Sequence, residues 1–364
     1  MNQARTLILL AIVILFGVGA VIYSRVVNPN ANVNQAALAP KILTATAFQI
    51  GDPLKNDFGE AAAWVQNNQL TRTIEIPGLD APLYCNADGS HCLVILGVGT
   101  PNAAVSMTAL ALSDKIDLSK TYIMFSGIAG TPPQQGTLGA VAWANYVVSG
   151  DTVSEYDARE IPADWKFGKV QYNCATPTCS TDFRTGVEMY RLNPTLTQWA
   201  YRLSKEVALQ DDDAARAYRA LYAENSPARR APFVMSPCAF LSDSTFWHGK
   251  LLSDWAEWWV NYWTQGQAPY CMVAIEETPM LTAITRLAKT GRIDINRVMV
   301  QRGASNFDQQ HAGQTAQESF HQALSGINGG STIALENLYR TGSAVNKYIL
   351  EHWNEWEKGV PNLP

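Results

Sequence analysis

Short apolar runs alternate with amphipathic stretches over most of the chain, and this alternation predicts the order of its elements. Residues 41–48 alternate and are rich in Ile, Leu and Thr, which predicts the first strand of the domain. The continuous apolar runs at 121–126 and 139–148 are typical of strands covered on both faces. Further strands are expected at 71–76, 92–96, 271–275 and 297–301, and helices at 103–112, 196–209, 214–223, 251–263, 279–288, 315–325 and 332–353. Strands that alternate with helices predict an α/β sheet.

The pattern weakens in the middle of the chain. Between about residues 155 and 249, polar loops and proline-marked turns interrupt the alternation of strands and helices. We interpret this stretch as an insertion that forms a lid or rim. The domain itself is expected to cover residues 41–364.

The N-terminus forms a separate element. Residues 7–23 are 17 positions without a charge, flanked by Arg5 and Arg25, which is at the short end of what spans a bilayer. Residues 1–25 are interpreted as an uncleaved signal anchor, with a signal peptide as the alternative. Residues 26–40, rich in Asn, Ala and Pro, are expected to be a flexible tether. This arrangement predicts a periplasmic or otherwise extracytoplasmic domain, tethered to the inner membrane through the N-terminal helix.

Composition excludes several classes of function. The net charge of −5 argues against a nucleic-acid partner, which would require a basic surface. The five histidines are scattered without metal-ligand spacing, so no metal site is expected. Beyond residue 40 no uncharged apolar run approaches ~18 residues, which excludes a multi-span transporter.

The cysteines agree with export. Cys85 and Cys92 enclose Asn-Ala-Asp-Gly-Ser-His, and Cys174 and Cys179 enclose Ala-Thr-Pro-Thr, so each pair can close a short loop as a disulfide. The alternative is four reduced, unrelated cysteines. The last two cysteines lie in apolar surroundings and are expected to be buried thiols: Cys238 and Cys271.

Several segments, taken in order, resemble a known family. They are Gly97-Val-Gly-Thr-Pro-Asn-Ala-Ala104, Tyr122-Ile-Met-Phe-Ser-Gly-Ile-Ala-Gly130, Val273-Ala-Ile-Glu-Glu277 and Arg302-Gly-Ala-Ser-Asn-Phe-Asp308. They resemble the nucleoside phosphorylase superfamily and, more closely, the purine nucleoside permease (NUP) family. Segments 156–162 and 242–249 are also similar to the NUP family, and the resemblance covers about residues 41–360.

The resemblance implies a nucleoside phosphorylase-like mixed sheet flanked by helices. It also implies purine nucleoside binding and cleavage of the N-glycosidic bond. Hydrolysis is preferred over phosphorolysis, because no arginine-rich anion site is visible. A non-catalytic purine nucleoside-binding protein that assists uptake is the alternative. No cofactor is expected; phosphate as a co-substrate and a homo-oligomer both remain open.

Cleavage of this bond builds positive charge on the ribose and negative charge on the leaving base. Glu276 and Glu277 end an apolar strand, where a carboxylate can accept hydrogen bonds from a ribose diol. In the NUP family this pair is typically Glu-Asp, so Glu277 is a mild departure. The alternative is a charge that complements the dipole of the following helix.

The segment around Asn306 resembles the part of the superfamily that contacts the purine. There a Ser, here Ser305, precedes an Asp or Asn, and the NUP family usually has Asp. An Asn cannot protonate N7, but its amide can bridge N7 and O6 of a 6-oxopurine. Asn306 and Asp308 are therefore expected to take part in catalysis. The alternative for Asn306 is a helix cap.

Residues that hold water or phosphate are expected in three places. By the resemblance, Ser126 and Gly127 belong to a glycine-rich turn that supports the ribose and the nucleophile. Gly51-Asp-Pro-Leu-Lys55 resembles a segment of hexameric bacterial phosphorylases, with Lys55 at the position of a phosphate-binding Arg. Arg302 is assigned to the same role.

The final candidates are a base and a set of base contacts. Glu60 precedes Trp64 with the spacing of the NUP family, and an acid in this region activates water in related nucleosidases, so Glu60 is a candidate general base. Its alternative is a first-turn helix glutamate. Asp243, Trp247 and His248 are expected to contact the purine, although a lone histidine is more often structural.

Overall fold

The computed structural model describes residues 36–364, of which Leu38–Pro364 form one compact unit. The expected signal anchor lies outside the described residues. Within residues 36–364, no helix is both long enough and apolar enough to cross a membrane.

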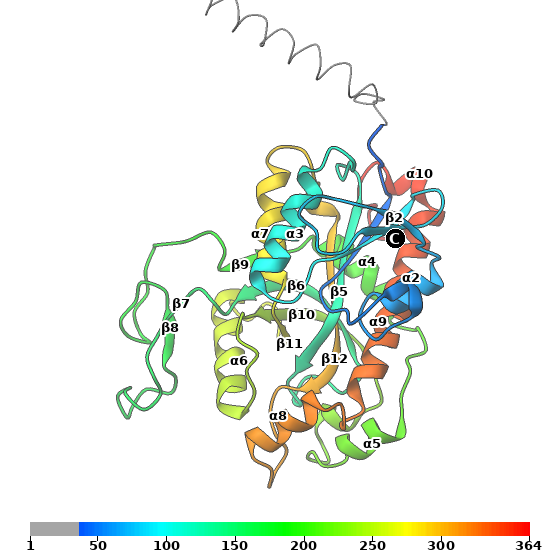
Figure 1. Cartoon of the computed structure of the whole chain (residues 1–364). Coiled ribbons are helices and arrows are strands. Elements are labelled where there is room, and N and C mark those ends of the chain that lie inside the picture. Colours follow the sequence, from blue (N-terminus) through cyan, green and yellow to red (C-terminus); the bar gives the residue numbers. More distant parts are fainter. Residues whose placement is uncertain (1–35) are drawn as a thin grey trace, which may run out of the picture. The chain divides into compact units, whose positions relative to one another are not determined.

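A ten-stranded mixed sheet forms the centre of the unit (Figure 1). One antiparallel bridge, between Val273 and Gly130, pairs β11 with β5, so that β5, β12, β6, β10 and β11 close into a ring. The strand order is β11 (Tyr270–Ala274), β10 (Val234–Ser242), β6 (Val141–Ser149), β12 (Val298–Phe307), β5 (Tyr122–Thr131), β1 (Ile42–Thr46), β4 (His91–Ile95), β3 (Leu83–Cys85) and β2 (Arg72–Ile74), with β9 (Met189–Arg191) beside β6.

Helices cover both faces of this sheet (Figure 1). One face carries α3 (Thr100–Leu112) and α7 (Glu277–Ala288). The other carries α2 (Ala62–Asn67), α4 (Pro194–Ser204), α9 (Gly330–Glu351) and α10 (Trp353–Trp356). The remaining elements are α6 (Lys250–Thr264), α5 (Asp213–Arg219), α8 (Ala316–Leu324), the two-stranded sheet of β7 (Val153–Glu155) and β8 (Lys169–Gln171), and the 3-10 turns η1 (Pro53–Lys55), η2 (Pro227–Arg229) and η3 (Ile295–Arg297).

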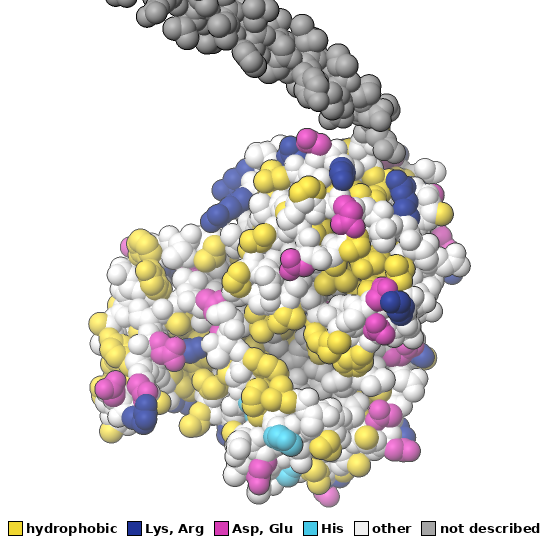
Figure 2. Space-filling model, viewed as in Figure 1, with side chains coloured by type: hydrophobic (Ala, Val, Ile, Leu, Met, Phe, Trp, Pro, Cys, Tyr) yellow, Lys and Arg dark blue, Asp and Glu magenta, His cyan; other side chains and the backbone are white. Residues whose placement is uncertain are grey.

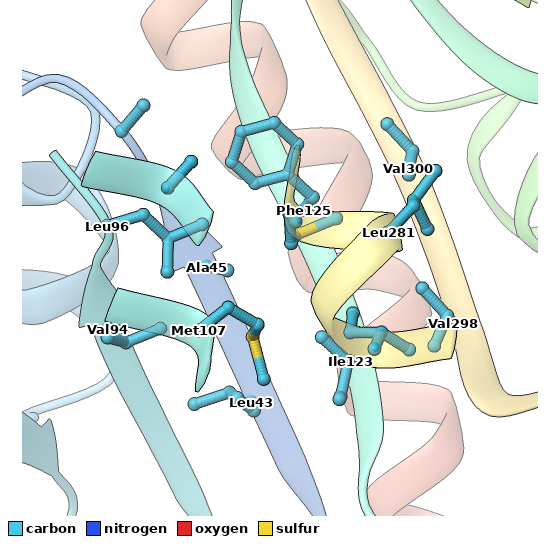
Figure 3. Packing of buried hydrophobic residues seen from close by; sticks show 14 of the residues in the cluster. Leu43, Ala45, Val94, Leu96, Met107, Ile123, Phe125, Leu281, Val298 and Val300 are labelled. Carbon is cyan, nitrogen blue, oxygen red and sulfur yellow. The ribbon is translucent and has the colours of Figure 1, made fainter. Parts of the chain in front are cut away.

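The period of two along the central strands divides the core between the two helical layers. In β5, Ile123 and Phe125 pack with the α3 and α7 side, whereas Tyr122 and Met124 pack with the α9 side. Figure 3 shows the first set, with Met107 of α3 between strand residues of β1, β4 and β5. Burial of each side chain of this size stabilises the folded state by about 1.5–3 kcal/mol. Because alternate residues of one strand face the two layers, the same strands hold both helical layers.

One strand of the ring lies inside the segment interpreted as a lid. Residues 234–242 form β10, which pairs in parallel with β6 and β11. The prediction missed it because Pro237 interrupts the apolar pattern, and the register does shift between Met235 and Cys238. The peripheral part of this segment therefore ends before residue 234.

Two central strands are longer than expected. β5 continues to Thr131 and β12 to Phe307. Gly127 and Gly130 consequently lie within a strand, and the expected glycine-rich turn is wrong. Asn306 is likewise a strand residue, so it does not cap a helix.

The predicted disulfides are confirmed, and there is a third. Cys85–Cys92 joins β3 to β4, and Cys174–Cys179 closes its short loop. The expectation of buried thiols at Cys238 and Cys271 is wrong, because these residues form a disulfide between β10 and β11. The pairing follows from the adjacency of these two strands.

Removal of the third disulfide is expected to destabilise the protein. Cys238→Ala with Cys271→Ala should lower the free energy of unfolding by about 2–5 kcal/mol, because this bridge spans 33 residues within the central ring. Urea unfolding measures the change. The matched control, Cys174→Ala with Cys179→Ala, opens a separation of 5 residues and should lose less. Equal losses for both double variants would contradict this expectation.

Candidate functional site

A cavity of about 360 Å³ lies where β5, β11 and β12 end and where the chain leaves β1. β1, β5 and β12 pair in parallel, so their carboxyl ends lie at one edge of the sheet, which is where α/β folds bind ligands. Hydrophobic side chains gather in the middle of the face shown in Figure 2. The polar side chains in the wall are Glu60, Glu276, Arg302, Ser305, Asn306 and Ser331.

Glu60 is held at the cavity wall by backbone amides from the segment after β1 and from β5. Its Oε2 accepts hydrogen bonds from the amides of Ala47 (2.8 Å) and Phe48 (2.9 Å), just after β1. Its Oε1 accepts one from the amide of Ile128 in β5 (2.7 Å). Burial raises the pKa of Glu60 to about 7, while Arg302 and the amides act in the opposite direction. A carboxylate with this pKa can accept and release a proton near neutral pH.

Arg302 lies at the centre of a buried charge cluster. Its Nε donates to Glu277 Oε1 (2.5 Å), and its Nη2 donates to Glu276 Oε2 (3.0 Å). The guanidinium also lies 4.5 Å from the ring centroid of Phe125. Three carboxylates, those of Glu60, Glu276 and Glu277, therefore surround one cation.

A glycine makes this approach possible. A Cβ on Gly127 would lie 2.3 Å from Arg302 Nη1 and 2.7 Å from Glu60 Oε1. A side chain at this position would separate the two groups. Gly127 is therefore needed at this position because it has no side chain, which lets Arg302 and Glu60 approach each other.

Glu276 and Glu277 occupy different positions although they are adjacent. Glu276 lines the cavity, and its Oε1 also accepts a hydrogen bond from the amide of Gly99 (3.1 Å). Glu277 begins α7, is fully buried against Arg302, and does not line the cavity. Burial raises the pKa of Glu277, and Arg302 opposes the shift. Only Glu276 can therefore face a ligand directly.

Ser305 and Asn306 line the cavity at the end of β12. Ser305 Oγ lies 3.0 Å from Asn306 Oδ1, to which it can donate, and Asn306 Nδ2 donates to the carbonyl of Phe307 (2.9 Å). The amide group is thus oriented by its own strand. A second N–H of Nδ2 remains for a ligand.

Other predicted residues lie away from the cavity. Ser126 accepts a hydrogen bond from Gln301 Nε2 (2.9 Å) on the α9 side, because it alternates with Phe125 and Gly127 along β5. Lys55, in η1, is exposed and lies 3.6 Å from Asp52. Asp243 is buried beside Lys169 Nζ at 3.3 Å.

A second group of predicted residues lies close to the cavity. Trp247 and Asp308 line a small chamber that shares Asn306 and Gly130 with the cavity wall. His248 packs against Phe320, and burial lowers its pKa to about 4. His248 is therefore neutral at physiological pH.

The aromatic part of the wall is less evident in the sequence. Phe48, Phe58 and Phe246 line the cavity, and the last two are about half exposed. Leu324, at the end of α8, adds a further exposed apolar side chain. Motif residues lie near these aromatic residues in the sequence. A single aromatic residue in a loop belongs to no periodic pattern, so the sequence alone does not predict that it lines a cavity.

Comparison with known proteins places the chain in a family. A family model described as purine nucleoside permease (NUP) matches residues 39–361, and the chain belongs to this family. A probable purine nucleoside permease of Schizosaccharomyces pombe is 31% identical over 337 residues, covering 88% of this chain and 92% of that protein. A purine nucleoside permease of Candida albicans is 32% identical over 311 residues, covering 82% of this chain and 75% of that protein.

Among solved structures, the chain resembles an MTA/SAH nucleosidase of Streptococcus pneumoniae in complex with 8-aminoadenine. The TM-score is 0.50 at 14% identity, covering 84% of this chain and 99% of that chain. This likeness concerns the fold, a mixed sheet flanked by helices.

Loss of the central cation should destabilise the protein strongly. Arg302→Met leaves the carboxylates of Glu276 and Glu277 buried without their partner, which should lower the free energy of unfolding by about 3–5 kcal/mol. Adding Glu277→Met should restore part of the loss, because it removes a buried charge. Urea unfolding of the single and double variants measures both effects.

A surface ion pair provides the control. Arg340 Nε lies 2.7 Å from Glu336 Oε1, with both side chains more than a third exposed. Arg340→Met should change stability by at most about 1 kcal/mol. A similar loss in both arginine variants would contradict a special role for burial at Arg302.

Proposed function

We propose that this protein binds purine nucleosides in the cavity and hydrolyses their N-glycosidic bond. The observation that carries the proposal is Glu60, a buried carboxylate with a pKa of about 7 at the wall of a cavity that also presents Glu276. The membership in the purine nucleoside permease family and the nucleosidase-like fold support a purine nucleoside as ligand.

Glu60 has the properties of a general base. In the proposed reaction it takes a proton from water while the oxygen of that water bonds to C1′ of the ribose. The C1′–N9 bond breaks, and its electron pair leaves with the purine. Positive charge on the ribose is stabilised by the surrounding carboxylates, which are preorganised by backbone amides and Arg302.

Glu276 is the residue proposed to hold the ribose. Its two oxygens accept hydrogen bonds from Gly99 and Arg302, and each oxygen has a second lone pair. These lone pairs can accept the two hydroxyls of a vicinal diol. Glu277 serves this function indirectly, since it orients Arg302.

The charge of the cavity favours water over phosphate as the nucleophile. Arg302 is the one cationic side chain among the described residues that line the cavity, and carboxylates already surround it. A phosphate dianion would need further cations to offset these carboxylates. Lys55, the other predicted phosphate ligand, points to solvent.

We place this activity outside the cytoplasm. Three disulfides involve all six cysteines, and such bonds persist in oxidising compartments. The apolar segment 7–23 would anchor the domain to the membrane. The protein would then act on nucleosides before uptake.

A binding protein without catalysis is the second candidate, and Asn306 favours it. An amide cannot deliver a proton to the leaving purine, and both ends of this amide already have partners in β12. A site of this kind can capture a nucleoside without cleaving it.

Product analysis distinguishes these functions. The domain is incubated with inosine, guanosine and adenosine, with and without phosphate, and the sugar products are identified. Free ribose supports hydrolysis, and ribose 1-phosphate would require phosphorolysis. Unchanged nucleoside together with measurable binding would identify a binding protein.

Substitution of Glu60 is expected to remove turnover. Glu60→Gln should lower kcat about 10²–10⁴-fold, because the amide cannot take a proton. In the unmodified protein, turnover should fall on the acid side of the pKa of about 7, where the carboxylate becomes protonated. Glu276→Gln, at the ribose, should raise KM instead. Unchanged kcat in Glu60→Gln would exclude this glutamate as the base.

Asn306 is expected to set the preference for the base. Its remaining N–H can donate to N7 and O6, which are both acceptors in inosine and guanosine, whereas adenosine places an amino donor beside N7; this favours inosine or guanosine over adenosine by ~1–3 kcal/mol, or roughly tenfold to a hundredfold. Asn306→Asp should narrow or reverse this preference. The ratios of kcat/KM for the three nucleosides test it, and equal turnover of adenosine by the unmodified protein would show that Asn306 does not read the base.

A further inference from the structure

Asp308 is a buried acid that is only half satisfied. Its Oδ2 accepts hydrogen bonds from the hydroxyls of Ser253 in α6 and Tyr270 in β11, both at 2.8 Å. Its Oδ1 is buried and has no hydrogen-bond partner among the described residues. An unpaired carboxyl oxygen in the interior is unfavourable, so this oxygen needs either its own proton or a donor.

The chamber beside Asp308 adjoins the main cavity. It measures about 20 Å³, and both Asp308 and Trp247 belong to its wall. Asn306, Gly130 and Phe246 line both spaces. A space of ~10–15 Å³ or more between polar groups is enough for one water molecule.

Two independent features identify this chamber as a water site. Trp247 Nε1 is a buried donor without a partner in the described part of the chain, and Asp308 Oδ1 is the corresponding acceptor or acid. Gly130 keeps the space open, because a Cβ there would lie 3.2 Å from Asn306 Nδ2 and 3.6 Å from Asp308 Cβ. A water in this chamber can thus serve as the partner of a buried donor and a buried acid that line the same wall.

On its opposite side, Asp308 is connected toward solvent. A second hollow of about 190 Å³ is lined by Ser253, Tyr270 and Gln309, together with the exposed Lys250. Gln309 Nε2 donates to Ser253 Oγ (3.0 Å), which in turn donates to Asp308. Hydroxyl groups thus link the buried acid to a space that reaches the surface.

Resting on the proposed hydrolysis, we propose that Asp308 supplies, through one water in this chamber, the proton that purine N7 takes when the glycosidic bond breaks. The chamber water gives a proton to N7 and receives one from Asp308 Oδ1. The electron pair of the C1′–N9 bond stays with the base, which leaves as a neutral purine. Asp308 becomes a carboxylate and regains its proton from solvent, while Glu60 releases there the proton that it took from the attacking water.

This arrangement explains how an asparagine can occupy position 306. Asn306 orients the purine by hydrogen bonds, and the acid lies two residues further along the chain. Base recognition and base protonation are then carried out by different side chains.

The surroundings of Asp308 suit an acid that titrates near neutrality. Burial raises the pKa of Asp308 to about 6, while the hydrogen bonds from Tyr270 and Ser253 lower it. Other ionisable groups around it are Tyr222, whose hydroxyl donates to the carbonyl of Gln309, and His248 in the loop before α6, where the amide of Gly249 donates to the carbonyl of Asp308. Toward the second hollow, the charged groups are Lys250, Asp254 and Glu257 of α6.

The active form needs Asp308 protonated and Glu60 ionised. With pKa values of about 6 and about 7, turnover of inosine should be highest between these two values and should fall on both sides. The fall on the alkaline side comes from the loss of the proton on Asp308. Asp308→Asn should remove this alkaline limb from any remaining turnover.

The decisive experiment compares two substrates in Asp308→Asn. Asparagine keeps the acceptor for Ser253 and Tyr270 and presents an N–H to the chamber, so it mimics the protonated acid but cannot release a proton. Turnover of inosine should fall about 10²–10⁴-fold. Turnover of 7-methylinosine should change little, because the methyl group already occupies N7 and the base leaves without protonation there.

Trp247→Phe provides a second, milder variant. It removes the indole N–H that holds the water while it retains an aromatic side chain, and it should also reduce inosine turnover more than that of 7-methylinosine. Thermal unfolding of each variant checks that the protein is folded.

Two outcomes would overturn the proposal. Equal losses for both substrates would show that Asp308 is structural, and unchanged turnover of inosine would show that it gives no proton. If the unmodified protein cleaves neither substrate, the proposed hydrolysis itself fails.

Discussion

The arrangement of the site depends on one buried cation. Arg302 offsets the repulsion among three buried carboxylates: it donates hydrogen bonds to Glu276 and Glu277 and acts on Glu60 through its charge alone. Glu277 and Glu276 arrive from the start of α7 and Glu60 from the segment before α2. The guanidinium of β12 therefore ties the start of α7 to the central sheet, and its charge also acts on Glu60 at the cavity wall.

The period of two in the central strands decides which residues reach this cluster. In β12, Gln301 points toward α9, where it bonds to Ser126 and to the carbonyl of Leu338, whereas Arg302 points toward α7. In β5, Ser126 and Gly127 divide in the same way. A shift of one residue in the pairing of these strands would turn each side chain to the opposite face. Arg302 would then point toward α9, and Gln301 would take its place beside the glutamates.

The closed ring of strands brings distant segments to the end of the cavity beside Asn306. Ser253 and Tyr270 reach Asp308 because α6 and β11 lie beside the end of β12. The Cys238–Cys271 bond ties β10 to β11 next to this region. The acid that we assign to proton delivery is thus held by elements that are separated by up to 55 positions along the chain.

The sequence by itself determined the alternation of strands and helices, the family and two disulfides, and it named Glu60, the Glu276–Glu277 pair and Asn306 as site candidates, of which Glu60, Glu276 and Asn306 line one cavity. These features are local, since an apolar run, a short loop between cysteines or a motif is complete within a few residues. Other features came only from the tertiary structure. Because Pro237 interrupts the apolar pattern, the sequence did not predict β10. It therefore did not predict that Cys238 lies beside Cys271 on the neighbouring strand. Which of two adjacent glutamates faces the cavity depends on the position of Arg302 in a neighbouring strand. Burial shifts the pKa of Glu60 and Asp308, and burial is a property of all the elements packed around a group rather than of its own segment.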